Sequence, residues 1–209
     1  DIINGKNIIN RVTDAKGNVD ETWFDVFGRK VKDRSIGSAS MITSYSYDEN
    51  NRLTEVERND GSKEENEYDE LGQLKQTKYF EAGENNSTYR LSYAYDANGN
   101  VTNESVTKGG KTHITEYSYD ELDRIIQKTQ GKDGVGALTI DYTYNIANQL
   151  VSISYPKEDN QSGVAASGTG MQTISYGYNS NGQLASVSLG GDVVRQYIYT
   201  AGGAISSIK

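Results

Sequence analysis

Few side chains in this 209-residue chain could do acid–base or nucleophilic chemistry. There is one histidine, His113, and no cysteine, which excludes thiol catalysis, cysteine zinc sites and disulfide scaffolds. A hydrolytic triad needs a nucleophile and an acid beside its histidine, but His113 follows a loop-like Gly-Gly-Lys-Thr stretch and no G-x-S-x-G elbow occurs. Glu64, Glu65 and Glu67 lie in a charged run that is typical of a solvated face. We therefore expect no enzyme, no catalytic residue and no cofactor.

Two short segments carry oxygen side chains at alternating positions, as calcium loops do. They are Asp96–Asn100 and Asp48–Asn51. A calcium loop supplies about six to eight oxygen ligands and is usually closed by a glutamate further along. Neither segment has that glutamate, and turn formation explains their aspartates and asparagines equally well. The sequence therefore predicts no metal site.

The composition favours a β protein that packs tyrosine where other chains pack leucine. Hydrophobic residues make up 34% of the chain, with 16 tyrosines, 22 glycines and one proline. The net charge of −8 argues against a nucleic-acid binder, because no excess of lysine and arginine is available to neutralise phosphates. No apolar stretch approaches the roughly 20 residues that span a bilayer.

An internal repeat organises the chain and positions these polar side chains. One or two aromatic residues precede an Asp or Asn, and three residues after it comes a Gly, Asn or Asp; the copies recur every 21 to 34 residues. The signature residues are Phe24, Asp25, Gly28, Tyr45, Tyr47, Asp48, Asn51, Tyr68, Asp69, Gly72, Tyr93, Tyr95, Asp96, Gly99, Tyr117, Tyr119, Asp120, Asp123, Tyr142, Tyr144, Asn145, Asn148, Tyr176, Tyr178, Asn179, Gly182, Tyr197, Tyr199 and Gly203.

Each copy predicts one β-hairpin. Two tyrosines separated by one residue share a face of a strand, and Asp or Asn suits the first position of a type I turn. The Gly, Asn or Asp three residues later tolerates the positive φ of a G1 bulge. We expect positive φ at Asn51, Gly72, Gly99, Asp123, Asn148 and Gly182, and an all-β sheet of about sixteen strands.

The repeats divide the chain into four parts. Residues 1–19 are a degenerate first repeat or a leader, and residues 20–155 are repeat hairpins. Residues 156–171 are a Gly/Ser-rich inserted loop, either a mobile loop or a plug that reaches a partner, and residues 172–209 are the last hairpins.

The spacing Y-x-Y-D-x-x-G-R-L resembles the YD repeat of Rhs proteins, wall-associated bacterial toxins, toxin-complex C components and teneurins, over roughly residues 20–209. That resemblance implies a curved, spiralling sheet, here an internal strip of a hollow shell. It also implies a non-catalytic structural role in enclosing and delivering a C-terminal toxin, in a bacterial protein that is secreted or associated with the cell surface or wall. The implied partners are the remaining YD repeats and an encapsulated toxin or cargo polypeptide.

The tyrosines allow two interpretations. They could form stacking platforms for sugars, as in a cell-surface carbohydrate-binding or adhesion module, or they could stack on one another across strands. Wall-binding repeats carry a tryptophan in most units, whereas this chain has only Trp23, so the structural interpretation is favoured. The sheet edges around Trp23–Val31 and Tyr197–Ile208 should need covering, and edge-to-edge self-association is one way to cover them. From Asn160 onward the only charges are those of Asp192, Arg195 and Lys209, which suits contact with another layer.

Overall fold

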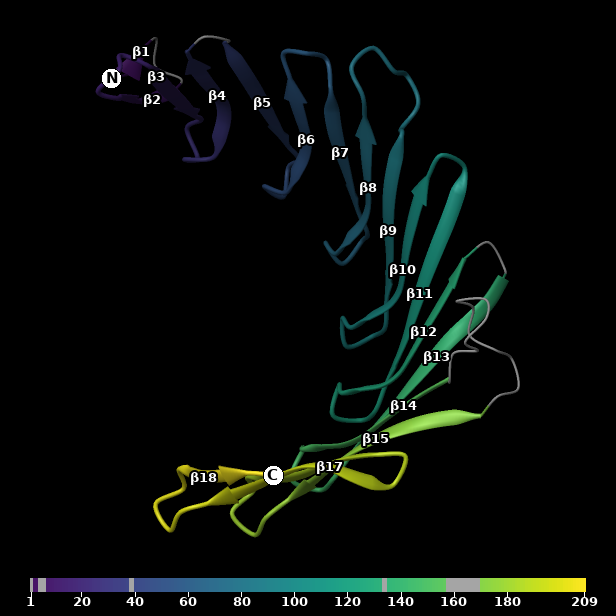
Figure 1. Ribbon diagram of the computed structural model, residues 1–209. Coiled ribbons are helices and arrows are strands. Elements are labelled where there is room, and N and C mark those ends of the chain that lie inside the picture. Colours follow the sequence, from purple (N-terminus) through teal and green to yellow (C-terminus); the bar gives the residue numbers. More distant parts are fainter. Residues whose placement is uncertain (1, 4–6, 38–39, 133–134, 157–169) are drawn as a thin grey trace. The chain divides into compact units, whose positions relative to one another are not determined.

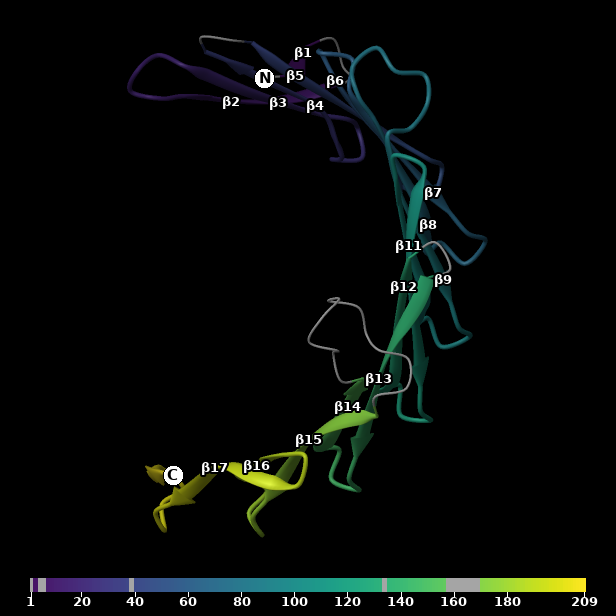
Figure 2. The same ribbon diagram turned by 45° about the vertical axis from the view of Figure 1, so that its right-hand side comes forward.

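The computed structural model describes residues 2–3, 7–37, 40–132, 135–156 and 170–209, and within these it contains eighteen strands and no helix (Figures 1 and 2). Hence no helix in these ranges is long and apolar enough to cross a membrane. The chain divides into two compact units. Unit 1 comprises Asp1–Tyr93 and Ser105–Gly110, and unit 2 comprises Ala94–Glu104 and Lys111–Lys209. The inserted loop at 156–171 lies outside the described residues over 157–169.

In unit 1 each strand pairs antiparallel with the next one along the chain, so its hairpins lie side by side (Figure 1). Its strands are β1 (Ile2–Ile3), β2 (Asn7–Thr13), β3 (Val19–Phe24), β4 (Lys30–Ile36), β5 (Met41–Tyr47), β6 (Leu53–Arg58), β7 (Lys63–Tyr68), β8 (Leu74–Phe80) and most of β9 (Tyr89–Tyr95).

Unit 2 repeats this arrangement, again with every strand antiparallel to its successor from β11 onward. Its strands are β11 (Lys111–Tyr119), β12 (Ile125–Lys132), β13 (Val135–Tyr144), β14 (Leu150–Pro156), β15 (Met171–Tyr178), β16 (Leu184–Leu189), β17 (Asp192–Tyr199) and β18 (Ile205–Ile208). The residues of β10 (Val101–Lys108) are divided between the two units.

The predicted hairpins are confirmed. Strands β3 to β18 supply the expected sixteen strands as eight hairpins, and β1 and β2 are additional. The Asp14–Gly17 turn has the same backbone hydrogen bond as the others, from Gly17 N to Asp14 O at 3.1 Å. It joins β2 to β3, however, so it lies at the opposite end of β3 from the Asp25–Gly28 turn. The same turn chemistry therefore serves both ends of this strand.

The turns have the predicted backbone conformation. All six turn residues that the sequence predicts to have positive φ do so, with values from 58° at Asp123 to 91° at Gly99. In the turn at Asp48, Asn51 N donates to Asp48 O at 3.1 Å and Asp48 N donates to Arg52 O at 3.0 Å. The strand register shifts at the second tyrosine of the hairpin, between Ser46 and Tyr47, as a bulge requires.

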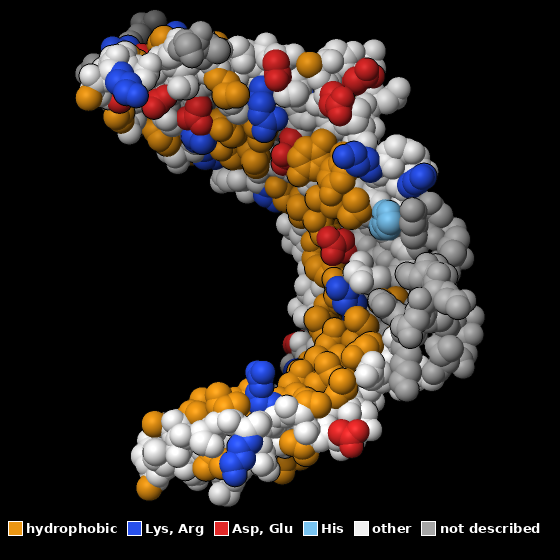
Figure 3. All heavy atoms as spheres, in the orientation of Figure 1, with side chains coloured by type: hydrophobic (Ala, Val, Ile, Leu, Met, Phe, Trp, Pro, Cys, Tyr) orange, Lys and Arg blue, Asp and Glu red, His pale blue; other side chains and the backbone are white. Residues whose placement is uncertain are grey.

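The sheet has two faces and almost no interior. The tyrosine face carries the signature tyrosines, and the aliphatic residue of the return strand lies opposite the first tyrosine of a pair, as Val56 does for Tyr45 and Ile153 does for Tyr142. Figure 3 shows hydrophobic side chains gathered along the strands in each unit. Among the described residues, only Val56 is a buried hydrophobic side chain, at 8% exposed. Contacts between neighbouring hairpins must therefore supply most of the stability.

The reverse face differs between the units. In unit 1 it is charged and includes Glu65, which is paired with Lys63 at 2.6 Å. In unit 2 small hydroxyl side chains pair across the strands, with Thr143 and Ser152 2.6 Å apart and other pairs at Ser154–Thr173 and Thr129–Thr139. The scarcity of charge late in the sequence thus corresponds to a hydroxyl-rich sheet face.

Candidate functional site

Each signature turn is closed by the side chain of its first residue. Asp48 Oδ1 accepts the backbone N–H groups of Asn50 and Arg52, both at 2.9 Å, and Asp48 Oδ2 accepts Arg52 Nε–H at 2.7 Å. The same three contacts occur at Asp25 with Arg29 and at Asp120 with Arg124. Where the first residue is Asn145 or Asn179, its amide instead donates to Gln149 or Gln183.

In most signature turns the fifth residue also reaches the next hairpin. Arg29 Nη1 donates to Asn51 Oδ1 at 2.7 Å, and Arg124 Nη1 donates to Asn148 Oδ1 at 2.8 Å. The glutamines donate instead to the carbonyl of the residue three after the next turn begins, from Gln149 to Gly182 at 2.7 Å and from Gln183 to Gly203 at 3.0 Å. One side chain thus closes its own turn and links it to the following turn.

The second tyrosine completes the link between hairpins. Tyr119 Oη donates to the backbone oxygen of Val101 at 2.7 Å, where Val101 opens the return strand of the preceding hairpin. The equivalent bonds, at 2.7 to 3.0 Å, are Tyr47 to Lys30, Tyr68 to Leu53, Tyr144 to Ile125, Tyr178 to Leu150 and Tyr199 to Leu184. We call the fifth turn residue, the second tyrosine of the next hairpin and their hydrogen-bond partners a clasp.

Arginine clasps include a cation–π contact as well. The guanidinium carbon of Arg29 lies 4.8 Å from the ring centre of Tyr47, and Arg52 lies at the same distance from Tyr68. Arg124 lies 4.6 Å from the ring centre of Tyr144. An arginine in this position covers the ring, orders the turn carboxylate and bonds the next turn at once.

The clasp environment shifts several pKa values. The backbone N–H of Arg52 is the main reason that the pKa of Asp48 lies below its usual value, and the Arg124 side chain does the same for Asp120. Burial, followed by the nearby Tyr117 and Asp96, raises the pKa of Tyr119. Both shifts favour the clasped protonation state, an ionised aspartate and a neutral tyrosine.

The clasp tyrosines do not stack on one another as the sequence interpretation expected. The structure shows a close pair of rings at Tyr79 and Tyr89, 5.3 Å apart, and neither residue belongs to the signature. Successive signature tyrosines are separated by the return strand, whose aliphatic residue stands between them, such as Val187 beside Tyr176. Their partners are therefore carbonyls, cations and aliphatic side chains.

Each of the remaining candidate residues lies on a strand. His113 lies in strand β11, not in a loop, and its side chain is exposed. Glu65 and Glu67 form ion pairs with Lys63 and Lys78. The described residues contain no group of three His, Cys, Asp or Glu side chains that could hold a metal ion.

The calcium-like segment at Asp96–Asn100 forms a clasp variant. Asn98 and Asn100 donate amide N–H groups to Asp123 Oδ1 at 2.9 and 2.7 Å. Asn100 also donates to Asp96 Oδ2 at 3.1 Å. These hydrogen bonds use the amide nitrogens to link the two turns.

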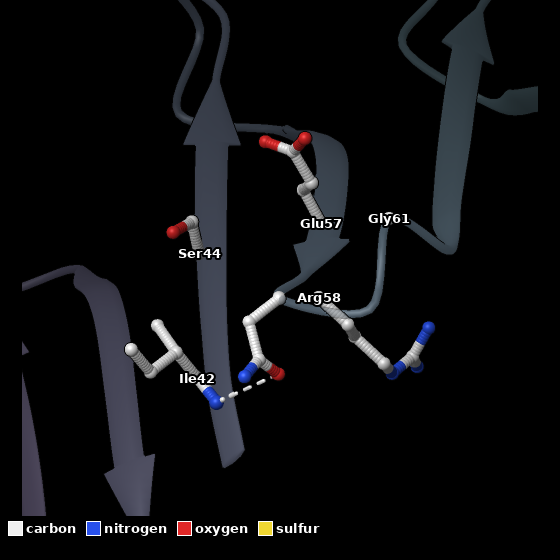
Figure 4. A pocket seen from close by; sticks show the side chains of 6 residues that line it. Ile42, Ser44, Glu57, Arg58 and Gly61 are labelled. Atoms are coloured by element: carbon white, nitrogen blue, oxygen red, sulfur yellow. Dashed lines mark hydrogen bonds between the residues drawn. The ribbon is translucent and has the colours of Figure 1, made fainter. Parts of the chain in front are cut away.

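A shallow hollow of about 290 Å³ lies beside the loop between β6 and β7 (Figure 4). It is lined by Ile42, Ser44, Glu57, Arg58, Asn59 and Gly61. Asn59 Oδ1 accepts the backbone N–H of Ile42 at 3.2 Å, and Asn59 Nδ2 donates to Ser40 O at 3.0 Å. The amide in this hollow thus ties the loop to β5.

Sequence reasoning missed one buried charged group. Glu21 is 3% exposed and lies between Arg11 and Arg34. The three charged residues are visible in the sequence, one in each of β2, β3 and β4, but only the strand register brings them together.

Comparisons with known proteins agree with this geometry. Residues 95–135 match the family model described as RHS Repeat. None of the curated proteins matches. The fold is similar to a crystal structure of TcdB2-TccC3 without its hypervariable C-terminal region (TM-score 0.66, 17% identity, 93% of this chain and 11% of that chain). It is also similar to TcdB2-TccC3-Cdc42 (TM-score 0.61, 17% identity, 93% and 12%).

A third similar structure is the Photorhabdus luminescens Tc holotoxin pore carrying a TccC3 mutation (TM-score 0.57, 18% identity, 93% and 12%). The chain therefore spans about a ninth of the length of the first of these relatives. At these identities the likeness shows the fold. The resemblance to the Rhs/YD repeat that the tyrosine–aspartate spacing indicated is confirmed.

Proposed function

We propose that this chain is a non-catalytic structural strip of a bacterial exported Rhs/YD-repeat protein and that it forms part of a shell wall enclosing a C-terminal toxin or cargo polypeptide for delivery. Its partners are then the remaining repeats of the parent protein and the enclosed polypeptide. Its location is outside the producing cell or on the cell surface or wall.

The clasp is the observation that carries this proposal. Its polar atoms bond other atoms of the repeat array, from turn to turn and from tyrosine to backbone, and are satisfied there. A wall needs such contacts, because a single-layer sheet without a core is held together only between neighbours. The likeness to about a ninth of a TcdB2-TccC3 chain supports the same conclusion.

The same geometry weighs against a carbohydrate-binding or adhesion module. Sugar rings stack on exposed aromatic faces, whereas guanidinium groups lie over the rings of Tyr47, Tyr68 and Tyr144. The hydroxyls of these tyrosines also donate to backbone carbonyls. A glycan-array screen with this chain should give no binding that depends on these tyrosines, and Tyr-dependent binding would favour the adhesion module.

Protease protection in the intact parent protein tests the enclosure. We expect the C-terminal segment to resist digestion in the parent and to be cut rapidly when expressed alone. The double variant Tyr144→Phe, Arg124→Gln should increase its digestion by loosening the wall. Ile146→Ser is the matched control, since Ile146 lies in the turn that this clasp links but its side chain is fully exposed. Equal digestion of the enclosed and isolated segments would contradict the proposal.

A further inference from the structure

Glu21 is the least exposed residue that the structure describes, at 3%. Glutamate is almost never buried to this degree unless it is paired. Here Arg11 places Nε at 2.7 Å and Nη2 at 2.5 Å from Glu21 Oε1. Arg34 places Nε at 2.8 Å from Glu21 Oε2, and its Nη2 contacts the same oxygen. Each carboxylate oxygen is thus held by one guanidinium.

The strand register sets this arrangement. Glu21 in β3 lies directly opposite Arg11 in β2 and Arg34 in β4, so the three side chains share one face of unit 1. Trp23 lies two residues further along β3 on the same face, opposite Lys32. Lys32 Nζ and Arg34 Cζ lie 5.4 and 5.6 Å from the centre of the Trp23 ring. We call Arg11, Glu21, Trp23, Lys32 and Arg34 the cationic cluster.

The charge of this cluster is opposite to that of the chain. It contains three cations and one carboxylate, whereas the whole chain carries −8. Burial raises the pKa of Glu21, but the hydrogen bonds and charges of Arg11 and Arg34 outweigh burial and hold the pKa below its usual value. An ionised Glu21 therefore stays between the two arginines.

The cations are accessible although the carboxylate is not. The Arg11 side chain is 63% exposed and that of Arg34 is 37% exposed. Among the described residues, no hydrogen bond occupies Nη1 of either arginine or Nζ of Lys32. A buried ion set of this kind is weak evidence for stability, but it does fix the directions of two guanidinium groups.

We propose that the cationic cluster binds the carboxylate groups of an acidic partner polypeptide, with Glu21 as the positioning residue that orients Arg11 and Arg34. A planar guanidinium presents donors in a fork that matches the two oxygens of a carboxylate. Fixing that fork in advance lowers the ordering cost of binding. Arg11 lies on β2, whereas Lys32 and Arg34 lie two residues apart on β4, so the cations are spread over several positions of the sheet. This spacing suits the several carboxylates of one polypeptide better than a single free oxyanion.

The test is fluorescence anisotropy of a labelled hexaglutamate peptide with the full 209-residue chain at low ionic strength. We expect saturable binding that weakens as salt is added, competition by millimolar phosphate, and no binding of hexaglutamine. Arg11→Gln should weaken binding at least tenfold. Arg34 still pairs with Glu21 in this variant, and far-UV circular dichroism checks that the variant is folded before its binding is compared. Lys111→Gln is the matched control, since it removes the same charge at an exposed position in unit 2.

Glu21→Gln separates positioning from simple attraction. It makes the cluster more positive, so a purely electrostatic site would bind hexaglutamate more tightly. A positioned site should bind it more weakly, with unchanged far-UV circular dichroism. Equal binding by Arg11→Gln and Lys111→Gln, or tighter binding by a folded Glu21→Gln, would overturn the proposal.

Discussion

The hydroxyl of Tyr119 allows the clearest measurement of what one clasp contributes. The fifth residue of the preceding turn is Asn100, so no guanidinium lies over this ring in the described structure, and Tyr119→Phe removes only the donor to Val101 O at 2.7 Å. A hydrogen bond of this type contributes on the order of 1 kcal/mol net, and the ring remains to fill the same space. We therefore expect the free energy of unfolding to fall by about 1 kcal/mol.

Urea denaturation followed by far-UV circular dichroism measures this loss. With a slope of about 2.5 kcal/mol per molar urea, the midpoint should fall by about 0.4 M. Ser118→Ala is the control, because Ser118 is exposed on the other face of the same strand and should change stability by less than about 0.5 kcal/mol. Since repeat arrays can unfold in parts, hydrogen exchange at the β10–β12 amides should show the loss locally. Equal midpoints for the two variants would refute the clasp as a source of stability.

Three other substitutions or conditions and one association test follow from the same geometry. Gly99→Val should lower the free energy of unfolding by at least ~1 kcal/mol, because φ is 91° there, while Gly99→Asn should cost less; equal losses in urea titrations would contradict this. Arg124→Lys should destabilise the protein nearly as much as Arg124→Gln, because neither side chain can close its own turn, bond Asn148 and cover the ring of Tyr144 at once. If Arg124→Lys kept the full stability, charge alone would explain the contribution of Arg124. The pKa of Asp120 is lowered by its hydrogen bond with Arg124, so the contribution of Asp120 to stability should be present above pH ~4 and lost as the pH falls through its lowered pKa in the folded state. The pKa of Tyr119 is raised by burial, so stability should also decline above pH ~10. A thermal midpoint that is flat at both extremes of pH would be inconsistent with these shifts. Sedimentation over a wide concentration range should show association through uncovered sheet edges, and a strict monomer with ordered terminal hairpins would show that the edges protect themselves.

The local hairpins could be predicted from the sequence because their chemistry lies within five residues. An Asp or Asn, a residue that tolerates positive φ and a following aliphatic residue specify the turn and bulge, as at Asp96 and Gly99, without reference to the rest of the chain. The strand count followed in the same way, since each turn implies two strands. The absence of helix in the described ranges agrees with the period-two aromatic pairs.

The side-chain contacts between hairpins could not be predicted, because they depend on the strand register, which the pattern of a single sequence does not specify. Tyr119 was expected against another tyrosine, but its hydroxyl bonds a carbonyl eighteen residues away, because an aliphatic residue of the intervening strand separates successive rings. Nothing in the sequence distinguished Glu21 from the other charged residues, because only the register of β2 and β4 places an arginine on each side of it. The Asp14 turn carried the repeat's signature, yet chain direction places it at the other end of β3. The turns can be predicted from the sequence because their interactions are local, whereas the pairing of side chains across strands is decided only when the strands are aligned.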